Sequence, residues 1–105
     1  MTEITAITVD PVERKIAVGK VPCDTFLIAR RFASRPRVTA TFPNGDVLLA
    51  VPSETVVRGF TIGGSKPIAG SALVVGRRRA FGERAPARTS LQDIETMVRW
   101  ISIER

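Results

Sequence analysis

The chain has no histidine, and this absence excludes most of the familiar catalytic and metal-binding arrangements. Histidine is the commonest general base and metal ligand, and it completes the Ser-His and Cys-His pairs that activate nucleophiles. The single cysteine, Cys23, cannot form a disulfide within the chain or build a zinc site without histidine. It precedes an expected helix start, where a thiolate can be stabilised, but a small, partly buried apolar side chain is the interpretation we favour.

The ten carboxylates are scattered and offer no paired acid and base. Asp93 and Glu95 lie two residues apart on an expected helix, so their side chains point to different sides. Asp10, Asp24 and Asp46 stand where turns and helix caps favour aspartate, and we expect structural roles for them. The sequence therefore predicts no enzyme, no cofactor and no metal.

Long apolar runs are also missing. No stretch of about 18 apolar residues is present to span a membrane, and the first residues lack the pattern of a signal peptide. With one cysteine, this pattern predicts a cytoplasmic protein that does not bind membranes. The 105 residues, 44% hydrophobic and 25% charged, have the composition of one globular domain, residues 1–105.

The strongest structural signal is the stretch 38–51, in which two β-prone runs flank a turn. Asn44-Gly45 between alternating apolar residues predicts a β-hairpin. Because Pro43 lacks an N–H and suits the second position of a type I turn, we expect Gly45 to be left-handed in a bulged turn. The expected register pairs Phe42 with Asp46, Ala40 with Leu48 and Val38 with Ala50.

The second strand of this hairpin is apolar on both sides. Val47, Leu49 and Val51 alternate with Leu48 and Ala50. A strand with two apolar faces indicates a central strand beneath a helix. The alternative is a face covered by a second copy of the chain, as in a homodimer, or by another partner.

Further hairpins predict a mainly antiparallel sheet of about five to six strands. Asp24 is expected to cap a short helix near residues 24–33, although its apolar residues do not fall on one stripe and a strand is the alternative. The other expected strands are Ile4 to Val9, Arg14 to Val18 with Ile16 and Val18 facing inward, Val56 to Ile62 and Ala72 to Val75.

A C-terminal amphipathic helix is predicted to begin after Ser90 and to pack on one face of the sheet. Its apolar stripe spans about 120° of the helical wheel. Trp100, on the flank of this stripe, is expected to lie in the seam between helix and sheet. These elements predict an α+β fold. The stripe comprises Leu91, Ile94, Met97, Val98 and Ile101.

Basic residues outnumber acidic ones by sixteen to ten, giving a net charge of +6, and most are arginine. One cluster lies between Asp24 and Asp46, and a second lies in residues 76–89. In the second, Gly82, Pro86 and charge repulsion predict a flexible, solvated basic loop. The charge either serves an acidic partner or reflects genome composition. The candidate binding residues are Arg30, Arg31, Arg35, Arg37, Arg77, Arg78, Arg79, Phe81, Arg84 and Arg88.

These candidates form one cationic surface or two separate ones. Arginines suit phosphate contacts, and Phe81 suits the stacking of one base. No RNA-recognition signature, helix-turn-helix or zinc finger is present, so we expect contact with the nucleic-acid backbone, or with an acidic protein, rather than base readout.

Several turns and caps together resemble a family of short, uncharacterised proteins carried by phages, plasmids and other mobile elements. The resemblance covers about residues 4–101 and implies a similar fold, without catalytic residues. The arginine-rich surfaces, taken with this resemblance, predict a small non-enzymatic accessory protein that contacts nucleic acid or a nucleoprotein. The alternatives are a counter-defence inhibitor, like anti-CRISPR proteins, that docks onto a host protein, and a structural, oligomerising domain. The matching residues are Asp10-Pro11, Asn44-Gly45-Asp46-Val47-Leu48, Gly63-Gly64, Ile68-Ala69-Gly70, Val74-Val75-Gly76 and Ser90-Leu91.

Overall fold

The α+β class is confirmed, with strands in two antiparallel sheets rather than one. The structure is a computed structural model that describes residues 3–32, 35–51, 58–65 and 67–102. Its elements are β1 (Glu3–Asp10), β2 (Lys15–Pro22), α1 (Thr25–Ala29), β3 (Arg37–Thr41), β4 (Val47–Ala50), β5 (Arg58–Ile62), β6 (Ile68–Ala69), β7 (Ala72–Val75), the 3₁₀ turn η1 (Ala80–Gly82), α2 (Leu91–Met97) and β8 (Val98–Ser102).

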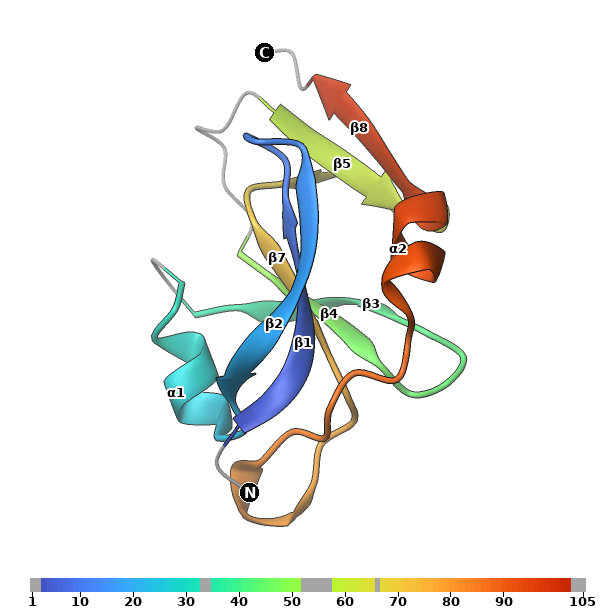
Figure 1. The fold of residues 1–105 in the computed structure, drawn as a ribbon. Helices are drawn as coiled ribbons and strands as arrows, with labels where there is room; N and C mark the ends of the chain where they lie inside the picture. The colour runs from blue at the N-terminus through green and yellow to red at the C-terminus, as the bar shows by residue number, and fades with distance from the viewer. Residues whose placement is uncertain (1–2, 33–34, 52–57, 66, 103–105) are drawn as a thin grey trace.

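A five-stranded sheet, in the order β2-β1-β7-β4-β3, forms the middle layer of the molecule. The helices α1 and α2 lie on opposite sides of it (Figure 1). Beside α2, the second sheet, in the order β6-β5-β8, covers the same face. The middle sheet therefore needs apolar side chains on both of its faces.

The interior strands meet this need by alternation. On β4, Leu48 and Ala50 join the core with the second sheet and α2, while Val47 and Leu49 join the core under α1. All four residues of β7 are buried in the same alternating way. The prediction that the 47–51 run forms a central strand is thus confirmed, since β4 lies between β7 and β3.

The turn of the central hairpin is confirmed, and its far end differs from the prediction. Gly45 has a φ of +93°, and its N–H donates to the Phe42 carbonyl over 3.0 Å. Ala40 pairs with Leu48 as expected, but a bulge at Thr39 moves Val38 opposite Leu49. The expected pairing of Val38 with Ala50 is wrong, and the shift leaves the Val38 side chain 50% exposed.

The N-terminal hairpin and the short helix are confirmed, with two details changed. The Asp10 carboxylate accepts the Val12 N–H in the turn, and the Asp24 carboxylate accepts the Phe26 N–H at the start of α1. The strand β2 is longer than expected. It forms an edge of the five-stranded sheet, and the Val18 side chain is half exposed, so the expectation that Val18 faces inward is wrong.

The C-terminal helix is shorter than predicted. Ser90 caps it by accepting the Asp93 N–H over 3.1 Å, and α2 packs on the sheet through Ile94. At Val98 the chain becomes β8, because β-branched and aromatic residues favour strands and β5 offers a five-residue ladder. The helical placement of Val98 and Ile101 is therefore wrong. Residues 56–57 of the expected strand lie outside the described residues, and β5 begins at Arg58.

Trp100 lies on β8, opposite Phe60 of β5. The two rings pack edge to face, with centroids 6.1 Å apart and an interplanar angle of 68°. Such aromatic pairs add about 0.5–1.5 kcal/mol beyond the area that they bury. Trp100 is a partly buried residue of the strand β8 that packs against the core, so the expected position between a helix and the sheet is corrected to a position in the second sheet.

Residues 76–86 extend β7 as an irregular hairpin, which we call the arginine hairpin. The Gly76 N–H donates to the Ala85 carbonyl and the Ala85 N–H to the Arg77 carbonyl, each over 2.9 Å. Its second leg is tied to the end of β2, because the Arg84 N–H donates to the Cys23 carbonyl over 2.8 Å. Residues 77–82 are exposed, as a solvated loop predicts, but the expectation is corrected for Arg84 and Ala85, which are buried.

The buried Asp46 carboxylate, only 1% exposed, joins the central hairpin to the segment that follows the arginine hairpin. Its Oδ2 accepts hydrogen bonds from the Arg88 N–H, the Thr89 N–H and the Thr89 hydroxyl, over 2.7–2.8 Å. The structural role expected for Asp46 is confirmed, but its partners lie more than forty residues along the chain.

Replacement of Gly76 by alanine is expected to destabilise the protein strongly. A Cβ there would lie 2.4 Å from the Pro86 carbonyl oxygen, so the two legs of the hairpin must separate. We expect the free energy of unfolding to fall by about 2–3 kcal/mol in urea titrations. Gly19→Ala is the matched control, because nothing lies within 4 Å of its added methyl. Equal stability of the two variants would contradict the close approach.

Replacement of Asp46 by alanine is expected to lower the free energy of unfolding by about 3 kcal/mol, because three hydrogen bonds to a buried carboxylate are lost. Glu95→Ala removes the same charge from an exposed position on α2 and should change the stability by less than about 0.5 kcal/mol. Thermal unfolding of both variants provides the measurement. If the two replacements lower the stability by the same amount, the Asp46 carboxylate does not link the central hairpin to the segment that follows the arginine hairpin.

Candidate nucleic-acid interface

The arginine hairpin presents its cations on two sides. Because successive side chains of an extended chain point in opposite directions, Arg78 faces away from Arg77 and Arg79. Arg78 pairs with Arg84 across the hairpin in an antiparallel bridge. The backbone therefore sorts the arginines into two groups, and each group lines a different cavity.

The first cavity lies between the arginine hairpin, α1 and the start of β3, and we call it the Arg84 cavity. It has a volume of about 150 Å³, and its cations are Arg35, Arg78 and Arg84. Its apolar lining includes Ile28 and Val38. Arg35, from the basic cluster that precedes the central hairpin, thus lies at the same cavity as Arg78 and Arg84 from the second cluster. The sequence alone did not decide whether the two clusters meet.

Arg84 is the unusual member of this group. The residue is only 7% exposed, and its Nε is buried with no hydrogen-bond partner. Burial, and then the neighbouring Arg78 guanidinium, hold the pKa of Arg84 below its ordinary value. Both causes disfavour the charged form, so an anion placed beside Arg84 would relieve them.

The second cavity lies on the other side of the hairpin and has a volume of about 340 Å³. Arg77, Arg79 and Arg88 line it, together with Asn44 and Asp46. The Asp46 Oδ1 is buried with no hydrogen-bond partner. The hydrogen bonds from the Arg88 and Thr89 backbone N–H groups to Oδ2 hold the backbone of Arg88, which lines this cavity, next to Asp46.

The tip of the hairpin exposes an aromatic ring. Phe81 is 98% exposed and has a φ of +61°, a conformation that bulky side chains rarely adopt. The Thr25 hydroxyl donates to the Gly82 carbonyl, which holds the tip against the start of α1. The next residue of α1, Phe26, is 72% exposed, so two phenylalanines flank this hydrogen bond.

Three of the predicted arginines are not gathered in this way. Arg30, Arg31 and Arg37 are exposed and line neither cavity. Within the described part of the chain, none of the ten predicted binding residues forms a salt bridge. Their positive charge is therefore left for solvent or a partner.

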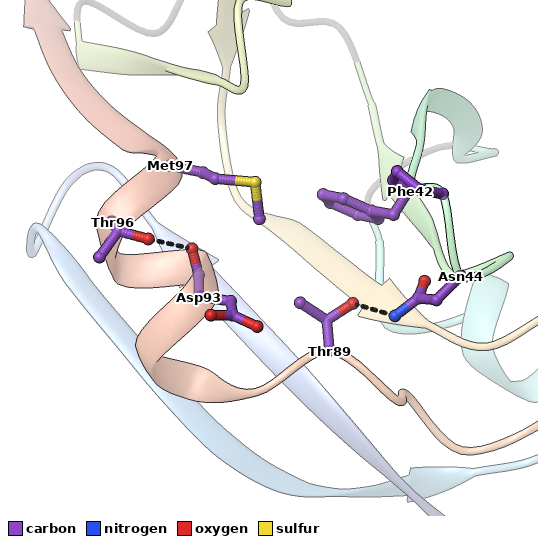
Figure 2. A pocket seen from close by; sticks show the side chains of 7 residues that line it. Phe42, Asn44, Thr89, Asp93, Thr96 and Met97 are labelled. Atoms are coloured by element: carbon purple, nitrogen blue, oxygen red, sulfur yellow. Dashed lines mark hydrogen bonds between the residues drawn. The ribbon is translucent and has the colours of Figure 1, made fainter.

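An apolar groove of about 330 Å³ lies between the central hairpin and α2. Figure 2 shows Phe42 and Met97 pointing toward each other across it, while Asn44 donates to the Thr89 hydroxyl over 2.9 Å at its edge. Asp93 is the one ionisable residue among the described residues that line it. A lone carboxylate provides no pair of general acid and general base.

Sequence reasoning missed the residues that shape the two cavities. The sequence predicts Asp46 only as a turn residue, and it predicts Thr25 only as part of the start of a helix. Their partners, Thr89 and Gly82, lie far along the chain, and no local pattern marks them. Cys23 is buried, as expected, and its carbonyl holds the second leg of the hairpin.

Two further properties concern the described residues only. No three acidic or cysteine side chains among them come together as metal ligands. No helix in the described ranges is long and apolar enough to cross a membrane.

Comparisons of the chain with protein-family models, with curated proteins and with solved structures found no match.

Proposed function

We propose that this chain is a small non-enzymatic binding protein that contacts nucleic acid, alone or in a nucleoprotein, through the arginine hairpin and Arg35. The observation that supports this most directly is the gathering of arginines from two distant segments around two cavities on either side of one hairpin. No described residue neutralises them by a salt bridge.

A nucleic acid suits this surface for two reasons. Guanidinium groups bind phosphate oxygens through paired hydrogen bonds, and arginine is favoured for this over lysine. The exposed rings of Phe81 and Phe26 offer faces on which unpaired bases stack. Arginines beside exposed aromatic rings are typical of proteins that bind single strands without sequence preference.

The contacts are expected to be with the backbone rather than with base edges. The described helices have five and seven residues, too short to serve as recognition helices in a major groove. We therefore expect sequence-tolerant binding, with a dissociation constant of about 10⁻⁴–10⁻⁶ M at physiological salt. A mobile element as the source is suggested by the resemblance of the turns and caps.

The salt dependence of binding tests this proposal. The affinity of the wild-type protein for a single-stranded oligonucleotide should fall linearly on a double-logarithmic plot against salt. The double variant Arg77→Gln/Arg79→Gln should reduce the magnitude of the slope by about 1.4 if each side chain contacts one phosphate. Fluorescence anisotropy across a salt series provides the measurement.

Arg99→Gln is the matched control for this series. Arg99 is exposed on β8, which lies at the other end of the molecule from the arginine hairpin (Figure 1). Its removal should leave the slope unchanged. An affinity that does not respond to salt, or equal slopes for all three proteins, would remove the proposal.

A second candidate function, docking onto a host protein as a counter-defence inhibitor, is favoured by exposed apolar residues. Leu27 of α1 is 41% exposed, Phe26 is 72% exposed and Val38 of β3 is 50% exposed. The strand β3 is also an edge of the five-stranded sheet, where another strand can be added. Single apolar residues on a protein surface are common, so these residues support docking onto a protein less strongly than the arginines support binding to nucleic acid.

Capture of partners from host lysate, with and without nuclease, separates the two candidates. Docking onto a protein predicts a defined partner that survives nuclease and is lost in Phe26→Ser/Val38→Ser. Binding to nucleic acid predicts that nuclease removes whatever is captured. Val12→Ser, at a 52% exposed position in the turn between β1 and β2, serves as the comparison for a general loss of apolar surface.

A further inference from the structure

We infer that the Arg84 cavity binds the terminal phosphate of a nucleic-acid strand, a phosphate monoester. The inference rests on the proposed function and specifies which group of the nucleic acid is recognised. It depends on three observations of this cavity: its size, its charge and the unpaired Arg84 at its wall.

The size of the cavity selects a compact group. Its volume of about 150 Å³ is less than half that of the cavity on the other side of the hairpin. Pockets for drug-sized ligands occupy about 300–1,000 Å³, so a nucleoside is too large for this one. A single phosphate group fits, with the rest of the strand lying outside.

The charge of the cavity selects an anion of high charge. Three guanidiniums, from Arg35, Arg78 and Arg84, are the only ionised groups among the described residues that line it. A phosphate monoester carries about −1.5 to −2 charges at pH 7 and three acceptor oxygens. An internal phosphodiester carries only a single charge, so it would balance less of the positive charge of the three guanidiniums.

The unpaired Arg84 points to a ligand rather than to a structural role. Buried arginines are almost never left without a partner, because desolvation of the cation is costly. Arg84 is 7% exposed, its Nε has no partner, and it pairs across the hairpin with another arginine. If the residue at this position had only a structural role, an apolar side chain would stabilise the protein more than a buried arginine does. An arginine here is explained by an oxyanion that enters the cavity.

Two hydrogen bonds to the backbone hold the walls of the cavity before a ligand arrives. The Arg84 N–H donates to the Cys23 carbonyl, which sets the backbone of that residue. The Thr25 hydroxyl, on the Gly82 carbonyl, closes the end of the hairpin against α1. A site whose walls are already in place binds a ligand more tightly, because less conformational entropy is lost on binding.

The test compares single-stranded oligonucleotides of one sequence that differ only at their ends. One carries a 5′-phosphate, one a 3′-phosphate and one has hydroxyls at both ends. The wild-type protein should bind one of the phosphorylated strands at least about tenfold more tightly than the hydroxyl strand. Fluorescence anisotropy at a fixed salt concentration measures the three affinities.

Two variants assign this preference to the cavity. Arg84→Met keeps the length of the side chain without the charge, and it should abolish the preference while the thermal midpoint without ligand stays equal or rises. Arg78→Gln, at an exposed position, should reduce the preference and tests the site even if Arg84→Met does not fold. Arg77→Gln/Arg79→Gln is the control, expected to weaken all three strands equally and to keep the preference.

The outcomes separate this inference from the proposed function. Equal affinities for the three strands, with the salt dependence intact, would overturn the strand-end site and leave the proposed function standing. If no strand binds, while inorganic phosphate raises the thermal midpoint of the wild type but not of Arg84→Met, a free phosphate is the ligand and both proposals fail in their present form. A preference that survives Arg84→Met and Arg78→Gln would also overturn the inference.

Discussion

The carboxylate of Asp46 is the constraint on which the arrangement of the site depends. It is buried, and its Oδ2 holds the backbone of Arg88 and Thr89 where the chain leaves the arginine hairpin and approaches α2. Because one oxygen accepts three hydrogen bonds, the central hairpin, the arginine hairpin and the start of α2 share one fixed point. This link acts together with the hydrogen bonds of the Arg84 N–H to the Cys23 carbonyl and of the Thr25 hydroxyl to the Gly82 carbonyl, which hold the arginine hairpin itself.

The sequence predicted those parts of the fold that are encoded over a few residues. Asn44-Gly45 identified the central hairpin, and Asp24 and Ser90 identified the helix starts, because turns and caps are settled by neighbouring residues. The apolar residues on both faces of β4 identified a central strand, because a strand with two apolar faces must be covered on both sides. In each of these cases, local chemistry and the final fold agree.

The errors arise where distant partners decide the conformation. The stretch after Met97 has apolar residues at helical spacing, yet a free edge of β5 draws it into a strand. The sequence predicted the arginine hairpin as a solvated loop because Cys23, the backbone partner of its second leg, lies more than sixty residues earlier in the chain. For the same reason, the sequence listed the arginines correctly as candidates but did not indicate which of them meet at one cavity.

The placement of charge in the hairpin connects the fold with the proposed function. A ladder fixed by Gly76 and Ala85 makes the alternate side chains of residues 77–79 point to opposite sides. The sheet is already covered on both faces by α1 on one side and by α2 and the second sheet on the other. Among the described residues, no carboxylate forms a salt bridge with the arginines of the hairpin. Burial and, after it, the neighbouring Arg78 guanidinium lower the pKa of Arg84 and so disfavour its charged form. Such an arrangement is consistent with selection for an anionic ligand, which would turn the repulsion into binding energy.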